Sequence, residues 1–316
     1  MKLIGTGSAL PRRVVTNDDI AQFLDADDAW IVSRTGIRSR HVISDELLED
    51  LAAQAARKAL DMAGLTAADI DFFICSNIVN EYITPGLSSI VASRIGLRCP
   101  MIDINCACPG FLYAMDIAES YFQAGKVRNV LILCAEEPTR MASWQDRSTC
   151  VLFGDGAGAA VFTRGDKLKA VKLSADPDPD MIYEYRHLLP TPFLTKEDKE
   201  ETPLMMKGRD VFKFAITTSC RDIRELLDRC GLSLDRADWF LIHQANLRIT
   251  EAIRGELGLA AEKFPTNIRD HGNSSSASCP ILLDECNRRG LFKPGDILVF
   301  SAFGAGLLSA AAVLEW

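Results

Sequence analysis

Short apolar runs alternate along the chain with longer stretches of helical periodicity. Residues 71–78 (DFFICSNI) and 129–136 (NVLILCAE) are short, apolar and rich in strand-forming residues, which predicts buried strands. Residues 47–65 (LLEDLAAQAARKALDMAGL) place apolar residues at helical spacing, and Gly64 suits the position just after a helix. This alternation predicts an α/β fold with largely buried sheets.

The chain also repeats itself at an offset of 167 residues, the distance from Gly64 to Gly231. Residues 64–77 (GLTAADIDFFICSN) align without gaps with residues 231–244 (GLSLDRADWFLIHQ). At the same offset, KVRNVLILCA from Lys126 aligns with KPGDILVFSA from Lys293, and Lys2 aligns with Lys169. We therefore predict two similar βα halves, residues 1–165 and 166–316, related by a pseudo-twofold axis.

Composition and charge narrow the class of protein. Of 316 residues, 48% are hydrophobic and 25% charged, as in ordinary globular proteins. No apolar run approaches the ~20 residues that span a bilayer, and the start MKLIGTGSALP lacks the pattern of a secretory signal, so we expect a cytoplasmic protein. The net charge of −8 argues against a nucleic-acid partner. Ten cysteines without a signal indicate free thiols in a reducing compartment.

Two of those cysteines, Cys106 and Cys108, stand in INCACPGF and admit four interpretations. A structural zinc site needs a second ligand pair, and a redox pair usually reads C-x-x-C; neither pattern is present. Buried filler remains possible, and Cys106 is expected to be core. Cys108 is the candidate nucleophile, because Pro109 and the helix-like residues 109–125 place it at a helix N-terminus, where a thiolate and an oxyanion are both favoured.

Two polar residues from the second half are candidate partners of that sulfur. His243 follows an apolar strand in FLIHQAN, and Asn273 lies in DHGNSSSAS, two residues before Ser275, which the repeat pairs with Cys108. The repeat therefore predicts that all three residues meet at the interface of the halves. The alternatives are a structural histidine, an asparagine that serves a turn or a helix cap, and His271 as a competing base.

Six segments together resemble one known family from end to end, the β-ketoacyl-acyl-carrier-protein synthase III family of condensing enzymes. In chain order they are WIVSRTGIRSRHV, DINCACPGF, DRSTCVLFGDGAGAAVF, LIHQANLRI, HGNSSSAS and SAFGAGLLSAAAV. The resemblance implies a thiolase-like fold with two pseudo-symmetric halves in five αβαβα layers. It also implies a homodimer without a metal or other cofactor, whose substrates are an acyl-CoA and the phosphopantetheine thioester of malonyl-acyl carrier protein.

The resemblance assigns roles to individual residues. Cys108 matches the acyl-accepting nucleophile, and His243 and Asn273 match the residues that assist decarboxylation of the malonyl thioester. A Cys-His-Asn set, rather than the Cys-His-His set of elongating synthases, points to an initiating enzyme of fatty acid or related synthesis. Further matches are Phe303, Gly304 and Gly306 beside the nucleophile; Trp30, Arg34, Arg147 and Asn246 as contacts to CoA; and Lys213, Arg248 and Arg254 as the docking patch for the acidic carrier protein.

Three positions depart from the family pattern. Pro109 stands where alanine or serine is commoner, and Arg209 where asparagine is frequent. Thr84 falls where a large aromatic residue of the partner subunit can wall the acyl pocket, which predicts a roomier pocket than an acetyl-specific enzyme has. The alternatives are a related condensing enzyme or acyltransferase of specialised metabolism with another acceptor, and an acyl-binding scaffold without activity.

Overall fold

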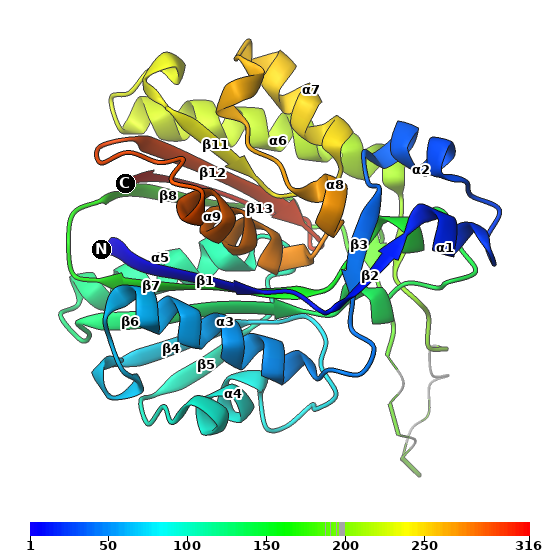
Figure 1. The fold of residues 1–316 in the computed structure, drawn as a ribbon, viewed down its shortest axis with the longest axis horizontal. Helices are drawn as coiled ribbons and strands as arrows, with labels where there is room; N and C mark the ends of the chain where they lie inside the picture. The colour runs from blue at the N-terminus through cyan, green and yellow to red at the C-terminus, as the bar shows by residue number, and fades with distance from the viewer. Residues whose placement is uncertain (187, 190, 194, 196–199) are drawn as a thin grey trace.

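The structure is a computed structural model that describes residues 1–186, 188–189, 191–193, 195 and 200–316. Two sheets form its centre (Figure 1). The first sheet has the order β1 (Lys2–Ala9), β7 (Gly156–Thr163), β6 (Asn129–Glu136), β4 (Phe72–Ser76) and β5 (Met101–Ile104). The second has the order β8 (Leu168–Ala175), β13 (Leu308–Glu315), β12 (Ile297–Gly304) and β11 (Trp239–Ile242).

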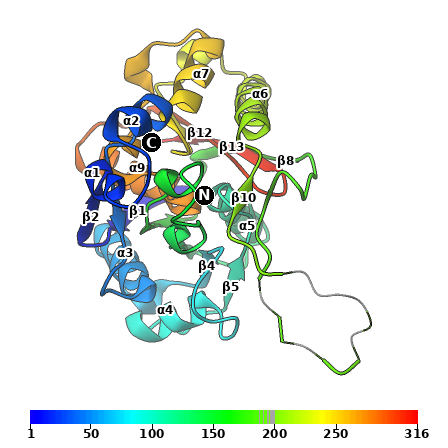
Figure 2. The same ribbon diagram turned by 90° about the vertical axis from the view of Figure 1, so that its right-hand side faces the viewer.

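Helices form three layers around these sheets (Figures 1 and 2). The central helices α5 (Gly110–Gln123) and α9 (Ser278–Arg288) lie between the sheets and contact both. The outer layers are α3 (Leu48–Ala63) and α4 (Leu87–Ile95) on the first sheet, and α6 (Gly208–Arg229) and α7 (Leu247–Leu257) on the second. The expected αβαβα arrangement is therefore confirmed.

The two sheets share one strand order, which gives the sequence repeat a structural counterpart. Strands β1-β7-β6-β4 follow one another as β8-β13-β12-β11 do, and β5 has no equivalent. In both sheets the last two of these strands are parallel and the others antiparallel. The domain boundary near residue 165 stays a prediction.

Just before the central helices, the structure pairs residues of the two halves differently, by one residue, from the sequence repeat. Ala107 and Ser275 both have a positive φ, of 49° and 51°, and each precedes the start of a central helix by three residues. The structural equivalent of Ser275 is therefore Ala107 rather than Cys108. The shift arises from the backbone, because the residue with positive φ forms a sharp turn that fixes where each helix begins. The two residues at this turn, an alanine and a serine, are not types that predict such a conformation.

The core holds the layers together. Between the sheets, Phe111 of α5 meets Phe300 of β12, with ring centroids 6.3 Å apart. On the outer face of the first sheet, alanines of α3 pack against β1 and β7. The close fit requires Gly7, because a Cβ there would lie 2.2 Å from the backbone oxygen of Ala55.

The strands and helix expected from the sequence are present. The helix expected over residues 47–65 is α3 and ends at Gly64 with φ of 65°, and the run at 129–136 is β6. Smaller elements surround the open end of the sheets: β2 (Arg13–Thr16), β3 (Ser39–Val42), α1 (Asn17–Ala21), α2 (Asp28–Thr35), α8 (Ile268–His271), β9 (Ile182–Tyr183), β10 (Met205–Met206) and the short 3-10 helix η6 (Ser275–Ala277). Over the described ranges, no helix has the length and apolar character needed to cross a membrane.

Candidate active site

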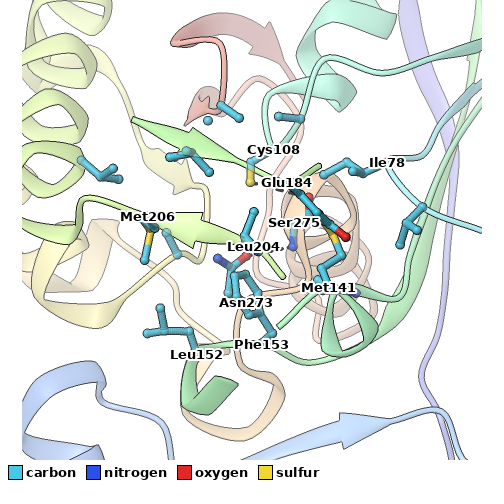
Figure 3. A pocket seen from close by; sticks show the side chains of 18 of the residues that line it. Ile78, Cys108, Met141, Leu152, Phe153, Glu184, Leu204, Met206, Asn273 and Ser275 are labelled. Atoms are coloured by element: carbon cyan, nitrogen blue, oxygen red, sulfur yellow. Dashed lines mark hydrogen bonds between the residues drawn. The ribbon is translucent and has the colours of Figure 1, made fainter. Parts of the chain in front are cut away.

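A cavity of about 1210 Å³ opens at the carboxyl ends of the strands from both sheets (Figure 3). Asn77 follows β4, Asn105 follows β5, His243 follows β11 and Gly304 ends β12, and all four line the cavity. Parallel strands deliver their following residues to one edge of a sheet, so residues distant in sequence meet there. The cavity thus lies where the two halves join.

Cys108 reaches this cavity from the loop between β5 and α5, two residues before the helix begins. Its side chain is half-buried, and its Sγ lies 3.6 Å from the Ser275 hydroxyl (Figure 3). Burial raises the pKa of the Cys108 thiol to about 12, more than the hydrogen bonds with Ser275 and its own backbone lower it. A pKa this high corresponds to a protonated thiol near neutral pH. That the N-terminus of α5 favours a thiolate at Cys108 stays a prediction.

Cys106 has a different setting. It does not line the cavity, and it is half-buried rather than fully in the core as expected. Burial raises the pKa of its thiol. Of the two cysteines in the motif, only Cys108 faces the space in which a substrate would lie.

His243 is held from both sides at the end of β11. Its side chain is 1% exposed, its backbone N–H donates to the oxygen of Ser301 at 2.8 Å, and its ring meets Phe303 edge-on with centroids 5.4 Å apart. Nδ1 lies 2.6 Å from the Ser278 hydroxyl, whereas Nε2 has no hydrogen-bond partner among the described residues. Burial lowers the pKa of His243 to about 3, so its imidazole is neutral at physiological pH.

Asn273 is fixed by the segment that contains the GDGAG motif. Its backbone N–H donates to the oxygen of Leu152 at 2.8 Å, and its oxygen accepts from the N–H of Gly154 at 3.1 Å. Its Oδ1 accepts from the N–H of Ser275 at 2.8 Å, so its amide N–H donors are left for the cavity that it lines. The glycine-rich segment thus positions the asparagine, a function that the motif alone did not reveal.

Gly304 packs against the backbone of the nucleophile candidate. A Cβ at this position would lie 2.9 Å from the backbone nitrogen of Cys108, closer than real Cβ atoms approach. Gly304 and Phe303 line the cavity, whereas Gly306, with φ of 135° in the turn between β12 and β13, does not. The end of β12 therefore packs directly against the backbone N–H of Cys108.

The Gly304→Ala variant is expected to have a free energy of unfolding lower by about 1–3 kcal/mol, because the methyl group must displace backbone. If Cys108 accepts an acyl group from acyl-CoA, as the resemblance implies, that reaction should slow in parallel, because the backbone N–H of Cys108 moves. Thermal unfolding and stopped-flow release of CoA measure the two effects. The matched control is Gly255→Ala in α7, where no atom lies within 4 Å of the added Cβ; wild-type stability and rate in both variants would contradict the tight fit.

Comparison with known proteins decides the family. Profiles described as 3-oxoacyl-[acyl-carrier-protein (ACP)] synthase III and its C-terminal region match residues 102–177 and 227–316. The chain is 40% identical to a β-ketoacyl-[acyl-carrier-protein] synthase III of Rhizorhabdus wittichii, over 99% of this chain and 98% of the relative. The chain belongs to the β-ketoacyl-acyl-carrier-protein synthase III family. The resemblance and the condensing-enzyme class expected from the sequence motifs are thereby confirmed.

Solved structures of the synthase III family agree. The crystal structure of a 3-oxoacyl-[acyl-carrier-protein] synthase III from Aquifex aeolicus superposes with a TM-score of 0.92 at 36% identity, over 100% of this chain and 99% of that one. A priming β-ketosynthase from a polyketide biosynthetic pathway gives a TM-score of 0.92 at 34% identity, over 99% and 95%.

The residues matched to CoA contacts in synthase III gather at the cavity entrance. Trp30 of α2 lies between two guanidinium groups, with the Cζ atoms of Arg34 and Arg147 at 4.8 Å and 5.0 Å from its ring centroid. All three side chains line the cavity. The Arg147 Nη1 also donates to the Asp25 carboxylate at 2.9 Å. The predicted role of these three residues as CoA contacts stays a prediction.

Asn246 lines the cavity as well, but both ends of its carboxamide are engaged. It caps α7 by accepting from the N–H of Arg248 at 2.9 Å, and its Nδ2 donates to the oxygen of Arg34 at 3.0 Å. The structure therefore gives it the task of joining α7 to α2. A direct contact between Asn246 and CoA stays a prediction.

The three residues of the expected docking patch differ in their exposure and in the contacts that they make. Lys213 is exposed on α6, and Arg248 lines the cavity mouth with its Cζ 5.6 Å from the Phe212 ring. Arg254 is held by an ion pair to Glu251 at 2.7 Å and by a hydrogen bond to the oxygen of Leu259. Among the described residues, Arg254 forms an ion pair and Lys213 and Arg248 do not. That the three form a docking patch stays a prediction.

Thr84 lies away from the cavity of its own chain. It is exposed, and its neighbours Tyr82 and Ile83 line the cavity instead, with Ile83 79% exposed. The predicted role of Thr84 concerned the pocket of a partner subunit and stays a prediction. Pro109, which we expected at the first position of the helix, is instead the cap residue before α5. Arg209 lines the cavity.

Sequence reasoning missed the residues that support the site from behind. Ser278 fixes the His243 ring, Ser275 contacts the Cys108 sulfur, and Glu136 lies buried below both. Serine and glutamate are common residues, and HGNSSSAS does not say which hydroxyl faces which neighbour. Within the described ranges, no group of three or more His, Cys, Asp or Glu residues could hold a metal ion.

Proposed function

We propose that the protein catalyses the decarboxylative Claisen condensation of an acyl-CoA primer with malonyl-acyl carrier protein and so initiates fatty acid or related synthesis. The observation that carries this proposal is the meeting of Cys108, His243 and Asn273 in one cavity, with the nucleophile from the first half and two neutral donors from the second. Its relatives named β-ketoacyl-[acyl-carrier-protein] synthase III support the same reaction.

The first half-reaction forms an acyl-enzyme. The Cys108 sulfur attacks the thioester carbonyl, the C–S bond to CoA breaks, and CoA leaves. The carbonyl oxygen, negative in the tetrahedral intermediate, binds the N–H of Cys108 and an N–H of the turn after Gly304. The close packing of Gly304 on the Cys108 backbone supports this pair of donors.

The second half-reaction needs donors that do not carry charge before it begins. Ser278 Oγ accepts from the N–H of Gln244 at 3.4 Å, so its own proton is available to His243 Nδ1. This assignment places the imidazole proton on Nε2, the atom without a protein partner. His243 Nε2–H and the Asn273 amide then donate to the malonyl thioester oxygen, which becomes an enolate as CO₂ leaves, and the carbanion attacks the acyl-cysteine.

Replacing Trp30 by alanine is expected to raise the KM for acyl-CoA about tenfold, because the ring can hold the nucleobase together with the arginines on either side. The kcat should change little, since Trp30 does not touch the reacting atoms. Steady-state kinetics measure both constants. An acyl-pantetheine substrate, which lacks the nucleotide, is the control; an equal rise of its KM would place the effect elsewhere.

Further parts of the proposal concern partners. Lys213 and Arg248 receive the acidic carrier protein, with Arg254 beside them, and the enzyme acts as a cytoplasmic homodimer. It needs no metal or redox cofactor, because every step above uses thioester chemistry and neutral hydrogen-bond donors. Exposed Ile83 beside the cavity supports a second subunit at this edge, since an apolar side chain so open to water gains by being covered.

The reaction is tested by offering a panel of acyl-CoAs with malonyl-acyl carrier protein and identifying the products by mass spectrometry. We expect β-ketoacyl-acyl carrier protein, formed from primers longer or more branched than acetyl as well. Products made only with malonyl-CoA would instead favour a condensing enzyme with another acceptor. The similarity to a priming β-ketosynthase of polyketide synthesis makes specialised metabolism the second candidate pathway.

A further inference from the structure

A carboxyl group without a described cation lies buried beneath the nucleophile. Glu136 is the last residue of β6 and is 1% exposed. Its Oε2 accepts from the N–H of Ile78 at 3.1 Å, and its Oε1 accepts from the Ser276 hydroxyl. No salt bridge to Glu136 is formed within the described part of the chain. A buried carboxyl held only by neutral donors is costly to ionise. Such groups are typical of functional sites.

Hydroxyl groups connect this carboxyl to the Cys108 sulfur. Ser275 and Ser276 are adjacent in η6, and the Ser275 hydroxyl lies 3.6 Å from Cys108 Sγ. The Ser275 hydroxyl also lowers the pKa of Glu136, whose carboxyl is bound by the neighbouring hydroxyl of Ser276. Adjacent hydroxyls of η6 therefore contact the thiol on one side and the acid on the other.

The same group of residues lies directly under the start of α5. Ser76 donates to Ser276 Oγ at 3.2 Å, and a Cβ at Gly110 would lie 2.0 Å from Ser76 Oγ and 3.3 Å from the Ser276 Cβ. This contact fixes the hydroxyls against the helix end that carries Cys108. The path from thiol to carboxyl is thus part of the rigid interface between the halves.

We propose that Glu136 receives the proton of the Cys108 thiol, with the Ser275 hydroxyl as the link between them. As the S–H bond of Cys108 breaks, its proton passes to Ser275 Oγ, and the Ser275 hydroxyl proton passes to a Glu136 oxygen. The thiolate, an intact serine hydroxyl and a neutral carboxylic acid result, with no net charge added to the buried site. When the C–S bond to the product breaks, the proton returns to the Cys108 sulfur by the same path, while CoA takes its proton from water.

The titration of the groups involved supports this role. Burial raises the pKa of Glu136 to about 8, so near neutral pH it can both accept and return a proton. Three thiols interact with it, Cys75 of β4, Cys134 of β6 and Cys108 before α5, and all three have a raised pKa. The hydroxyls of η6 carry no charge. The charge of an ionised Glu136 thus contributes to the raised pKa of Cys108.

The obvious alternative base is less suitable. His243 binds the Ser278 hydroxyl through Nδ1, and its pKa is lowered to about 3, so its imidazole has little affinity for a proton. Its task in the second half-reaction also requires that it stay neutral with a proton on Nε2. Assigning the thiol proton to Glu136 leaves His243 free for that task.

The test is the pH dependence of the alkylation of Cys108 by iodoacetamide in the full chain, followed by peptide mass spectrometry between pH 6 and pH 10. In the wild type, the logarithm of the rate should rise with unit slope and then flatten near the pKa of Glu136, about 8. In Glu136→Gln the flattening should vanish, and the rate should keep rising to pH 10. Glu137→Gln is the matched control, an adjacent carboxyl that pairs with Arg140, and should retain the inflection.

Two further variants keep the test decisive if Glu136→Gln does not fold. Ser276→Ala removes a donor that lowers the Glu136 pKa, so the inflection should move to higher pH. Ser275→Ala removes a hydrogen bond that lowers the Cys108 pKa, so the rate on the plateau should fall about tenfold. Any of three results would overturn the proposal. They are a wild-type alkylation rate that rises with unit slope over the whole pH range, an inflection that persists in Glu136→Gln, and an inflection that does not shift in Ser276→Ala.

The inference rests on the proposed function only for the identity of the acyl donor. Iodoacetamide requires neither CoA nor a carrier protein, so the two claims fail separately. If the inflection is present and depends on Glu136, but no acyl-CoA acylates Cys108, the proposed reaction is wrong and the proton assignment stands. If acyl-CoA reacts normally and the inflection is absent, the proton assignment alone is wrong.

Discussion

Replacing Cys108 by alanine is expected to abolish the covalent acyl adduct and to lower the condensation rate by about 10⁴–10⁶-fold, because the variant lacks the sulfur that holds the acyl group between the two half-reactions. The fold should survive, since alanine keeps the Cβ and removes only the sulfur that faces the cavity. Intact-protein mass spectrometry after incubation with acyl-CoA detects the adduct, and product formation from malonyl-acyl carrier protein gives the rate.

Cys106→Ala is the matched control for that loss. Cys106 lies two residues away and does not line the cavity, so its variant should form the adduct and turn over at close to the wild-type rate. An adduct that persists in Cys108→Ala, or one that disappears in Cys106→Ala, would show that another thiol carries the acyl group.

The second large effect concerns the two donors from the C-terminal half. His243→Ala and Asn273→Ala should each lower the condensation rate by about 10²–10³-fold, because each removes one hydrogen bond to the oxygen that becomes negative as CO₂ leaves. Acylation of Cys108 should stay close to wild type in both, since neither residue binds the acyl-CoA oxygen in the first half-reaction. Rapid-quench mass spectrometry separates the two rates.

His271→Ala tests the competing histidine. The His271 Nε2 lies 2.6 Å from the Glu285 carboxylate, its ring centroid lies 5.3 Å from that of His41, and it does not line the cavity. Its variant should condense at the wild-type rate.

The prediction for His243 fails if His243→Ala slows both half-reactions equally. Such a result would indicate that the imidazole acts on the thiol, contrary to its lowered pKa.

Much of the fold could be predicted from the sequence, because the burial of apolar side chains determines where its strands and helices form. The runs at 71–78 and 129–136 are strands β4 and β6, and the amphipathic run before Gly64 is α3. Such elements follow from apolar spacing alone. The pairing of Cys108 with Ser275 across the repeat was off by one residue, because the positive φ of Ala107 and Ser275 cannot be predicted from residue type.

The principal site residues could also be anticipated, but their protonation states could not. The repeat and the motifs place Cys108, His243 and Asn273 together, since all three follow strands or precede central helices. That Cys108 is a neutral thiol depends on how completely the site is desolvated, which only packing determines. The same holds for Glu136, whose neighbours Ser275 and Ser276 come from the other half of the chain.

The most direct measurement is a chase of the isolated acyl-enzyme. The protein is incubated with acyl-CoA, freed of CoA by gel filtration, and then given malonyl-acyl carrier protein alone. The account predicts that the mass added at Cys108 disappears while one equivalent each of β-ketoacyl-acyl carrier protein and CO₂ forms. An acyl-enzyme that persists, or that only hydrolyses to free acid without a new carbon–carbon bond, would contradict it.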